Sequence, residues 1–447
     1  MESQAITPEL EELLRGRRWS EVRKHVEEWS EPEIADLLMG LPSSEQVLLF
    51  RSLPRELAAE VFAYLDYEEQ NELLRHFTEQ ETSELLANLD ADDRTALFEE
   101  LPANVTLRLM SLLSPEDLAE AKKLLGYPEE SVGRLMNPDY IAVRAHWTVA
   151  RALDHVRRWG QDIENINLVY VRDADGRLLD ELRLRELILA EPEESISDLM
   201  DESVVALSAF DDREVAVRMM QKYDYSALPV VDSQGVLIGM VTFDDLFDVA
   251  EAEATEDMHK GAAVSALRVS YDRAPITMLY KKRVGWLMLL VVLNLVSSGV
   301  IGAFEETLEA AIALAFFIPL IADSCGNTGS QSSMLMIRAL VTGDIELSDW
   351  LRTLAKELGV GILLGLTLGF LSMFLGFFRG GPIIGLVVGI TMVSVVLISN
   401  LIGTVLPFIL TRLKLDPATA SAPLITTIAD ALGLLVYFSV ATALLDL

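Results

Sequence analysis

The chain has 447 residues, of which 51% are hydrophobic, and a formal net charge of −33 at pH 7. Its mean hydropathy of +0.30 is high for a purely soluble protein, and the length allows several domains. The only cysteine, Cys325, excludes an internal disulfide and lies in an apolar segment, which favours a packed thiol over a reactive one.

The negative charge is concentrated in the first 280 residues, which hold 58 acidic and 27 basic side chains. Such a region repels nucleic acid and anionic lipid and attracts divalent cations, although a merely solvated acidic surface has the same composition. We therefore expect no nucleic-acid partner. The opening sequence MESQAITPELEELL lacks the basic and apolar regions of a signal peptide, so this region is expected to stay in the cytoplasm.

Residues 1–130 contain a 12-residue repeat. From Pro42 onward a helix-capping or helix-starting residue recurs every 12 positions, and each unit carries an apolar pair, from Leu49-Phe50 to Leu109-Met110. This spacing predicts short helices that stack and bury their apolar pairs against one another. We expect an acidic, all-α superhelical domain with a structural rather than a chemical role.

Residues 131–257 alternate β-rich and helical segments, and the order of strand, Asp-x-x-Gly turn, strand and helix occurs twice. The copies begin at LMNPDYIAVRAHWTVARAL and LMDESVVALSAFDDREVAV. This α+β region resembles a pair of cystathionine-β-synthase (CBS) domains, about 131–190 and 197–257, which commonly sense ligands. The resemblance implies an ATP or AMP site at Thr242 and Asp245 in GMVTFDD, whereas the first copy has Arg183 and Glu186 there.

A helical pattern without a break runs from Asp245 to Pro275, which predicts a connecting helix over residues 245–274. Five carboxylates lie along one broad stripe of this helix: Asp245, Asp248, Glu253, Glu256 and Asp257. Carboxylates at this spacing repel one another, which a solvated face tolerates. The alternative is that bound cations hold the helix in place, because it leads directly into apolar segments.

Five apolar segments follow, at about 284–304, 310–340, 356–378, 382–411 and 419–445, each long enough to cross a bilayer. Basic residues lie almost entirely at one set of ends, which predicts that the N-terminal region is cytoplasmic. We therefore expect residues 275–447 to form an all-α membrane domain with five spans.

Two of these spans carry polar residues. The second contains IADSCGNTGSQS, in which Asp323 and Asn327 favour the lining of a path over the alternative, close helix packing through small residues. On the last span Ala422, Thr426, Asp430 and Gly433 follow one another on one face, so Ala422 and Gly433 are further candidates for the lining of the path. Because an aspartate at a bilayer centre costs roughly 2.5–3.5 kcal/mol, Asp430 is expected to have a function, and its oxygens suit a hard cation.

The whole chain resembles the MgtE family of bacterial magnesium channels, through EAEATEDMHK, GNTGSQS, PLITTIADALGLL and the domain order. The resemblance implies a homodimer with the ion path between two membrane domains, and Asp430 as the pore aspartate that holds hydrated magnesium. It also implies cytoplasmic magnesium-sensing positions and a connecting helix that acts as a plug; the sensor positions are Asp92, Glu214, Asp224, Asp245, Asp248, Glu253, Glu256, Asp257 and Asp416. Ala422 and Ser330 depart from the family pattern, which has asparagine at both positions.

These observations predict a magnesium-selective channel, not an enzyme, in the bacterial inner membrane, closed when cytoplasmic magnesium binds its acidic domains. No P-loop is present to drive transport with ATP. One alternative is a secondary transporter that exchanges divalent cations for protons or sodium through Asp430 or Asp323. Another is a nucleotide sensor for which the spans are only an anchor, although anchoring does not require two carboxylates in the membrane.

Overall fold

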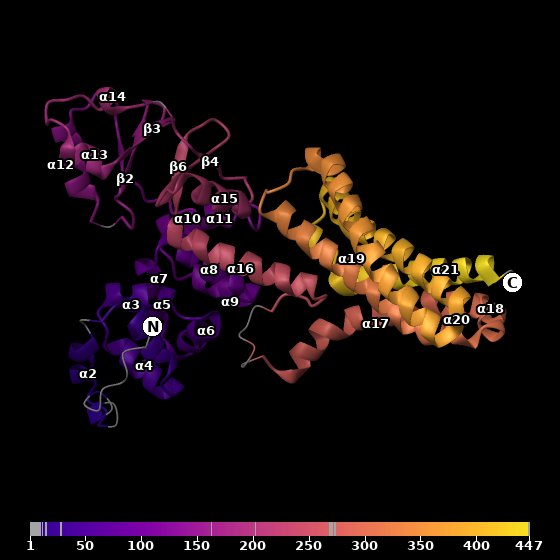
Figure 1. Ribbon diagram of the computed structural model, residues 1–447. Helices are drawn as coiled ribbons and strands as arrows, with labels where there is room; N and C mark the ends of the chain where they lie inside the picture. Colours follow the sequence, from indigo (N-terminus) through magenta and orange to yellow (C-terminus); the bar gives the residue numbers. More distant parts are fainter. Residues whose placement is uncertain are drawn as a thin grey trace. The chain divides into compact units, whose positions relative to one another are not determined.

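The computed structural model describes residues 10, 12–13, 16–26, 29–161, 163–201, 203–267, 271 and 274–445. The contacts within the chain divide it into two compact units, Met1–Ala250 and Glu251–Leu447. The first unit holds the helical repeats and both β-sheets, and the second holds the long apolar helices (Figure 1).

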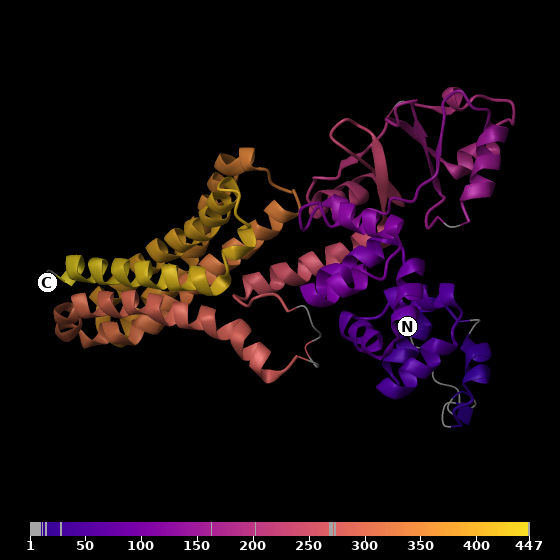
Figure 2. The ribbon, with the colours of Figure 1, turned by 180° about the vertical axis from the view of Figure 1, so that it is seen from behind.

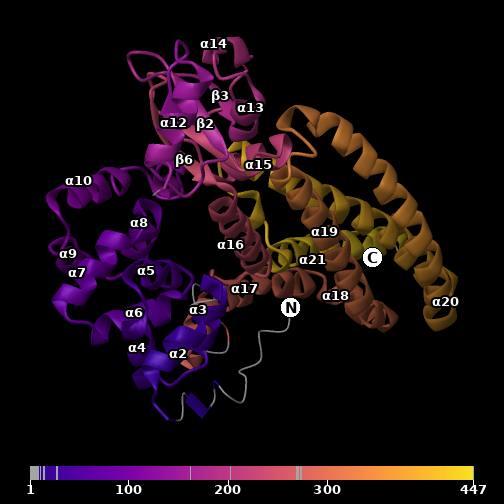
Figure 3. The same cartoon turned by 90° about the vertical axis from the view of Figure 1, so that its left-hand side faces the viewer.

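The helical repeat of the first unit has the predicted period. After α2 (Trp19–Val26) and α3 (Glu31–Met39), helices begin at 12-residue intervals: α4 (Ser43–Ser52), α5 (Arg55–Ala63), α6 (Tyr67–His76), α7 (Glu79–Asn88), α8 (Ala91–Glu100), α9 (Ala103–Met110) and α10 (Pro115–Leu124). Figure 3 shows them following one another in an arc. Each of these seven helices begins directly after a proline, aspartate, threonine or serine, since these residues favour the extended conformation of an N-cap.

The apolar pairs form the core of this arc. Leu49-Phe50, Val61-Phe62, Leu85-Leu86 and Leu97-Phe98 are all buried, and α3, α4, α5 and α8 each pack against the second helix along the chain. The prediction of an all-α superhelix is therefore confirmed.

Two similar three-stranded sheets follow, with α11 (Val132–Leu135), α12 (Val149–Trp159) and α13 (Leu184–Leu189) in the first copy and α14 (Ile196–Leu199) and α15 (Arg213–Tyr223) in the second. The first sheet is β1 (Ala142–Val143), β2 (Leu168–Arg172) and β3 (Leu178–Arg183); the second is β4 (Leu207–Ser208), β5 (Ala227–Val231) and β6 (Leu237–Thr242). In each, the first two strands are parallel and the last two antiparallel. The copies meet through reciprocal bonds: Leu178 N–H donates to Gly235 O (3.0 Å) and Leu237 N–H to Gly176 O (3.1 Å). The internal duplication is confirmed.

The connecting helix α16 (Phe243–Gly261) is shorter than predicted. Ala263 adopts a left-handed conformation (φ 58°), and the amides of Ala263 and Val264 donate to the carbonyls of Lys260 (2.9 Å) and His259 (2.8 Å). This bonding pattern ends a helix. The prediction of a helix to residue 274 is therefore wrong at its C-terminal end, and residues 268–270 and 272–273 lie outside the described part.

The second unit contains α17 (Ile276–Ala303), α18 (Glu305–Ala310), α19 (Ile318–Val341), α20 (Trp350–Arg412) and α21 (Ala422–Leu445), with 3-10 turns at Ile312–Phe317, Leu347–Asp349 and Pro417–Thr419. Among the described residues, four helical segments are long and apolar enough to cross a membrane, at Ile276–Ala303, Ile312–Val341, Leu347–Arg412 and Ala422–Leu445. The third has 66 residues, which is far more than one crossing needs.

Helix α20 is two helices joined by a turn. Gly381 has a φ of 87°, and a Cβ built on Gly376 would lie 2.8 Å from the Cα of Gly385. Farther from the turn, a Cβ on Gly369 would lie 3.0 Å from the carbonyl oxygen of Gly389, so the halves run antiparallel in contact. The described chain therefore has the five predicted apolar segments, and α19, α20 and α21 pack side by side (Figures 1 and 2).

Candidate functional site

Helices α19 and α21 approach each other through glycine. A Cβ on Gly326 would lie 2.6 Å from the Cγ2 of Thr426, and one on Gly329 would lie 2.9 Å from a side-chain carbon of Ile425. At these two glycines the structure supports close helix packing, which was the alternative to the lining of a path. The approach brings the polar part of α19 against the start of the last span.

At this contact Ser330 joins the two helices. Its hydroxyl lies 3.1 Å from the Oγ1 of Thr426 and donates to the carbonyl oxygen of Ala422 (3.2 Å). The resemblance described above marks Ser330 and Ala422 as its two departures, and both lie in this one contact beside Thr426. Three oxygens are thereby brought together.

Asp430 lies one turn farther along α21 from Thr426. Its Oδ1 is buried and accepts no hydrogen bond from any residue that the structure describes. Asp323 on α19 is close enough for charge repulsion, and Asp323 and Asn327 are both exposed in the single chain. Two carboxylates in an apolar helical unit, one of them with an unpaired oxygen, form an arrangement that a cation stabilises.

Gly433 does not share this exposed position. It is buried, and a Cβ built on it would lie 2.3 Å from the sulfur of Cys325. A glycine in such a helix contact offers no face to a water-filled path, so the structure does not support the pore-lining prediction for Gly433. Cys325 itself is fully buried, as expected.

The sequence analysis missed a carboxylate on α20. Glu357 Oε2 accepts from Asn400 Nδ2 (3.1 Å) and from the hydroxyl of Ser332 on α19 (3.4 Å). Thr404 lies 3.0 Å from Ser332 and donates to the carbonyl oxygen of Asn400 (2.8 Å). Asn400, Ser332 and Thr404 are each at most 4% exposed, so this polar network is internal.

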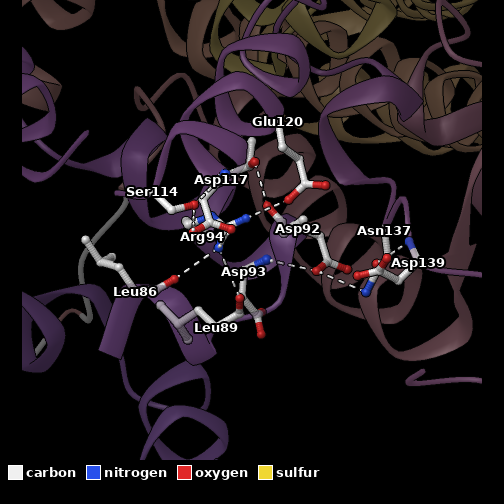
Figure 4. A network of polar contacts seen from close by, with 12 residues as sticks. Leu86, Leu89, Asp92, Asp93, Arg94, Ser114, Asp117, Glu120, Asn137 and Asp139 are labelled. Atoms are coloured by element: carbon white, nitrogen blue, oxygen red, sulfur yellow. Dashed lines mark hydrogen bonds and ion pairs between the residues drawn. The ribbon is translucent and has the colours of Figure 1, made fainter. Parts of the chain in front are cut away.

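In the first unit, Asp92 and Asp245 belong to one acidic cluster. Figure 4 shows Asp92 beside Asn137. Burial, followed by repulsion from Asp245, raises the pKa of Asp92 well above its usual range and that of Asp93 to about 7. Asn137 donates to Asp92 (3.5 Å) and to Glu164 (3.2 Å), which brings the first CBS copy to the same place. A divalent cation relieves such repulsion.

Arg94 carries a positive charge that acts on Asp90 and Asp139, but its hydrogen bonds are directed away from Asp92. Arg94 is 3% exposed, and its guanidinium pairs with Glu120 (2.7 Å) and donates to the carbonyl oxygen of Leu86 (3.0 Å). Figure 4 shows it reaching from α8 toward α10 and the end of α7. Arg94 therefore ties three helices together.

The proposed nucleotide residues Thr242 and Asp245 bond to each other. The Thr242 hydroxyl donates to Asp245 Oδ2 (2.7 Å), and burial raises the pKa of Asp245 to about 6. A phosphate placed here would meet Asp92 and Asp93 as well. The surroundings of Asp245 therefore suit a cation better than a free nucleotide phosphate.

Of the remaining first-unit positions, Asp248 adjoins this cluster because its charge acts on Asp245, whereas Glu214 and Asp224 lie on α15. Glu214 pairs with Arg218 (3.2 Å) on the exposed face of α15, and Asp224 is the exposed, left-handed residue that ends α15. Asp248 is exposed on α16.

In the second unit, α16 meets the segment that precedes α21. Lys260 pairs with Glu256 (2.6 Å) and with Asp416 (2.7 Å). Burial and the nearby Asp416 raise the pKa of Asp257, while Lys260, Glu253 and Glu256 act on it more weakly. Burial alone would lower the pKa of Lys260, but its bonds to Asp416 and Glu256 hold it above the ordinary value. Four predicted sensor residues are thus brought together around a lysine.

Within the described residues, no group of three or more His, Cys, Asp and Glu side chains converges closely enough to hold a metal ion directly. Magnesium keeps several of its waters and needs few protein ligands, so a site of one or two carboxylates is consistent with its chemistry. Such a site can also be completed by a second copy of the chain.

Comparison with known families identifies the architecture. Residues 318–440 match the MgtE model, described as a divalent cation transporter, and residues 29–130 match the MgtE intracellular N domain. Residues 132–193 and 196–252 match the CBS domain. Over 440 residues, 98% of both chains, the protein is 42% identical to the magnesium transporter MgtE of Thermus thermophilus. This chain belongs to the MgtE family.

Two further relatives agree. The magnesium transporter MgtE of Bacillus subtilis is 37% identical over 335 residues, which is 74% of each chain. A crystal structure of the cytosolic domain of the Mg2+ channel MgtE in complex with ATP is 37% identical, with a TM-score of 0.51 over 54% of this chain and 98% of that one. The MgtE family is one of membrane transporters rather than enzymes, with an intracellular N domain.

Proposed function

We propose that this chain forms a magnesium channel in the bacterial inner membrane, with its soluble region in the cytoplasm. Two copies enclose the ion path, and Asp430 of each copy holds a hydrated magnesium ion. The membrane potential supplies the driving force, about 4.6 kcal/mol for a divalent ion at 100 mV.

The observation that carries this proposal is the unpaired Oδ1 of Asp430. A buried carboxylate oxygen without a donor is costly, and in an apolar helical unit no ordinary stabilising role for it remains. Thr426, Ser330 and Asp323 add oxygens around it. Hydrated magnesium, which binds through its waters, satisfies such a set of acceptors.

Closure follows from the acidic residues of the cytoplasmic region. Magnesium bound at Asp92 and Asp245, and at Glu256, Asp257 and Asp416, neutralises repulsion among carboxylates from different parts of the chain. The bound state holds α16 as a plug over the path. When internal magnesium falls, the repulsion returns and the path opens.

Nucleotide binding at the CBS pair is a second level of regulation in this proposal. Its support is the 37% identity with a cytosolic domain that was crystallised with ATP. Because Asp245 lies among carboxylates, we expect the magnesium complex of ATP to bind better than free ATP. Calorimetry with each form checks this, and equal or absent heats for both would contradict it.

The decisive experiment is magnesium flux into proteoliposomes that contain the full chain. Asp430→Asn keeps the side-chain size but removes the charge, so we expect flux to fall by at least about tenfold. Glu309→Gln, which changes an exposed acidic residue of α18, is the matched control and should conduct like the parent. Parent-like flux in Asp430→Asn would exclude the pore role.

Single-channel recording separates the channel from a secondary transporter, because a carrier turns over too slowly to give resolved unitary currents. If the parent protein shows no flux under any gradient, both transport functions are excluded. The remaining alternative is then a nucleotide sensor that the spans anchor in the membrane.

A further inference from the structure

Glu357 is an ionisable residue of the helical membrane unit. The proposed transport function does not yet give it a role. It lies in the second turn of α20, and all of its side-chain hydrogen bonds are to buried groups of other helical segments. It stands at the edge of a predicted span, and its carboxylate is bonded to groups of the protein interior.

The network of Glu357 joins three segments at one point. Asn400, on the second half of the α20 hairpin, donates through Nδ2 both to the Glu357 carbonyl oxygen (2.8 Å) and to its carboxylate (3.1 Å). Ser332 brings in α19 through the same carboxylate oxygen and through Thr404. One carboxylate on the first half of the hairpin thus bonds to the second half and to α19.

At this point α19 cannot shift toward α20, because the two backbones are already in contact. A Cβ built on Gly403 would lie 2.2 Å from the carbonyl oxygen of Gly329, so the backbones of α19 and α20 already touch beside Ser332. With Glu357 bound on this side, both the height and the rotation of α19 are fixed.

The opposite face of α19 carries the candidate ion path. At 100° per residue, Asp323, Asn327 and Ser330 project roughly opposite to Ser332. Ser330 contacts Thr426, and Asp323 is within charge range of Asp430. A rotation of α19 that followed the loss of Glu357 would therefore move these side chains relative to Asp430.

We propose that Glu357 is a positioning residue for magnesium transport: it orients α19 so that Asp323, Asn327 and Ser330 complete the site at Asp430. This rests on the proposed function. Glu357 acts through hydrogen bonds rather than through its charge, because it contacts the face of α19 that is turned away from the path.

The test uses proteoliposomes of the full chain and measures magnesium flux and the ratio of magnesium to calcium flux. In Glu357→Ala we expect both to fall, the flux by about tenfold, because Asn400 and Ser332 lose their acceptor. In Glu357→Gln the amide oxygen can still accept from Asn400, so at least half of the flux should return. Ser332→Ala, a milder change, should lower the flux about threefold.

Each outcome decides the proposal. A parent-like flux and ratio in Glu357→Ala would overturn it, and if Asp430→Asn is inactive in the same assay, the pore role of Asp430 still stands. A flux in Glu357→Gln as low as in Glu357→Ala would show that the charge is required, which also overturns a positioning role. If Glu357→Ala does not fold, Ser332→Ala and Glu357→Gln carry the test, and parent-like conduction by Ser332→Ala would contradict it.

Discussion

Gly403 and Gly329 allow two membrane helices to touch at the backbone. A Cβ on Gly403 would lie 2.2 Å from the Gly329 carbonyl oxygen and 3.0 Å from the Cβ of Ser332. Because backbone atoms cannot move aside cheaply, Gly403→Ala should lower stability by about 1–3 kcal/mol. Thermal unfolding in detergent measures the change.

Gly359 is the matched control for that substitution. It lies in the same helix, and a Cβ built on it would meet no atom within 4 Å. Gly359→Ala should be neutral or up to about 1 kcal/mol stabilising, since alanine favours a helix. Equal midpoints for the two variants would contradict the close approach of α19 and α20.

Single residues differed in how far the sequence could predict them. Asp430 was evident because it interrupts an apolar span, and the structure shows that its Oδ1 lacks a donor among the described residues. Glu357 was not evident, since it follows Lys356 at the edge of a predicted span and its partners lie 25 and 43 residues away. Only the packing of α19 on the hairpin reveals its contacts.

At the scale of elements, patterns that depend on neighbouring residues were predicted well. The 12-residue period gave the helices of the superhelix, because each cap and each apolar pair acts within its own repeat. The end of α16 was misjudged because the left-handed residue there is Ala263, where glycine would have been the usual signal. The α20 turn at Gly381 fell between two predicted spans, as expected.

Lys260 joins α16 to the segment before α21. The spacing of residues in the sequence does not predict this contact. Its ammonium lies between Glu256 and Asp416, where it supplies the positive charge that a divalent ion would otherwise supply. We therefore expect Lys260 to hold α16 against the segment before α21 in magnesium-free protein. In Lys260→Met that contact should depend entirely on magnesium.

Spin labels at Thr255→Cys and Thr419→Cys, both exposed positions, report the distance between these segments, while native Cys325 is buried from the label. In chelator, the close population should fall by at least about half in Lys260→Met and persist in Lys260→Arg, which keeps a positive charge. Magnesium should restore it. An unchanged distribution in Lys260→Met would remove the lysine from the mechanism.

At the scale of the whole molecule, the sequence predicted the order of the domains. How two copies associate cannot be derived from interactions within one chain. The net charge of −33 is a property of the complete chain, and most of it lies where magnesium sensing is proposed. Folding therefore places carboxylates near one another against their repulsion, and the stability of the chain should depend on both magnesium and protons.

The sign of that dependence follows from the raised pKa values. Burial raises the pKa of Asp93 to about 7 and that of Asp245 to about 6, whereas an unfolded aspartate titrates near 3.8. Between these values the folded chain binds more protons than the unfolded chain, so its stability without magnesium falls as pH rises from about 4 to 7. Asp90, Asp92, Asp244 and Glu164 face the same cluster and strengthen the effect, and Arg94 is directed toward Glu120 instead.

Magnesium should therefore stabilise the folded chain more at about pH 8, where the cluster is ionised, than at about pH 6, where protons already neutralise part of it. The measurement is the unfolding midpoint in millimolar magnesium minus that in chelator at each pH. Asp93→Asn should raise the magnesium-free midpoint at the higher pH and shrink the difference between the two pH values. Asp175→Asn, at an exposed turn, should leave both as in the parent. Equal magnesium shifts at the two pH values would mean that the cluster around Asp92 and Asp245 is not where the ion binds.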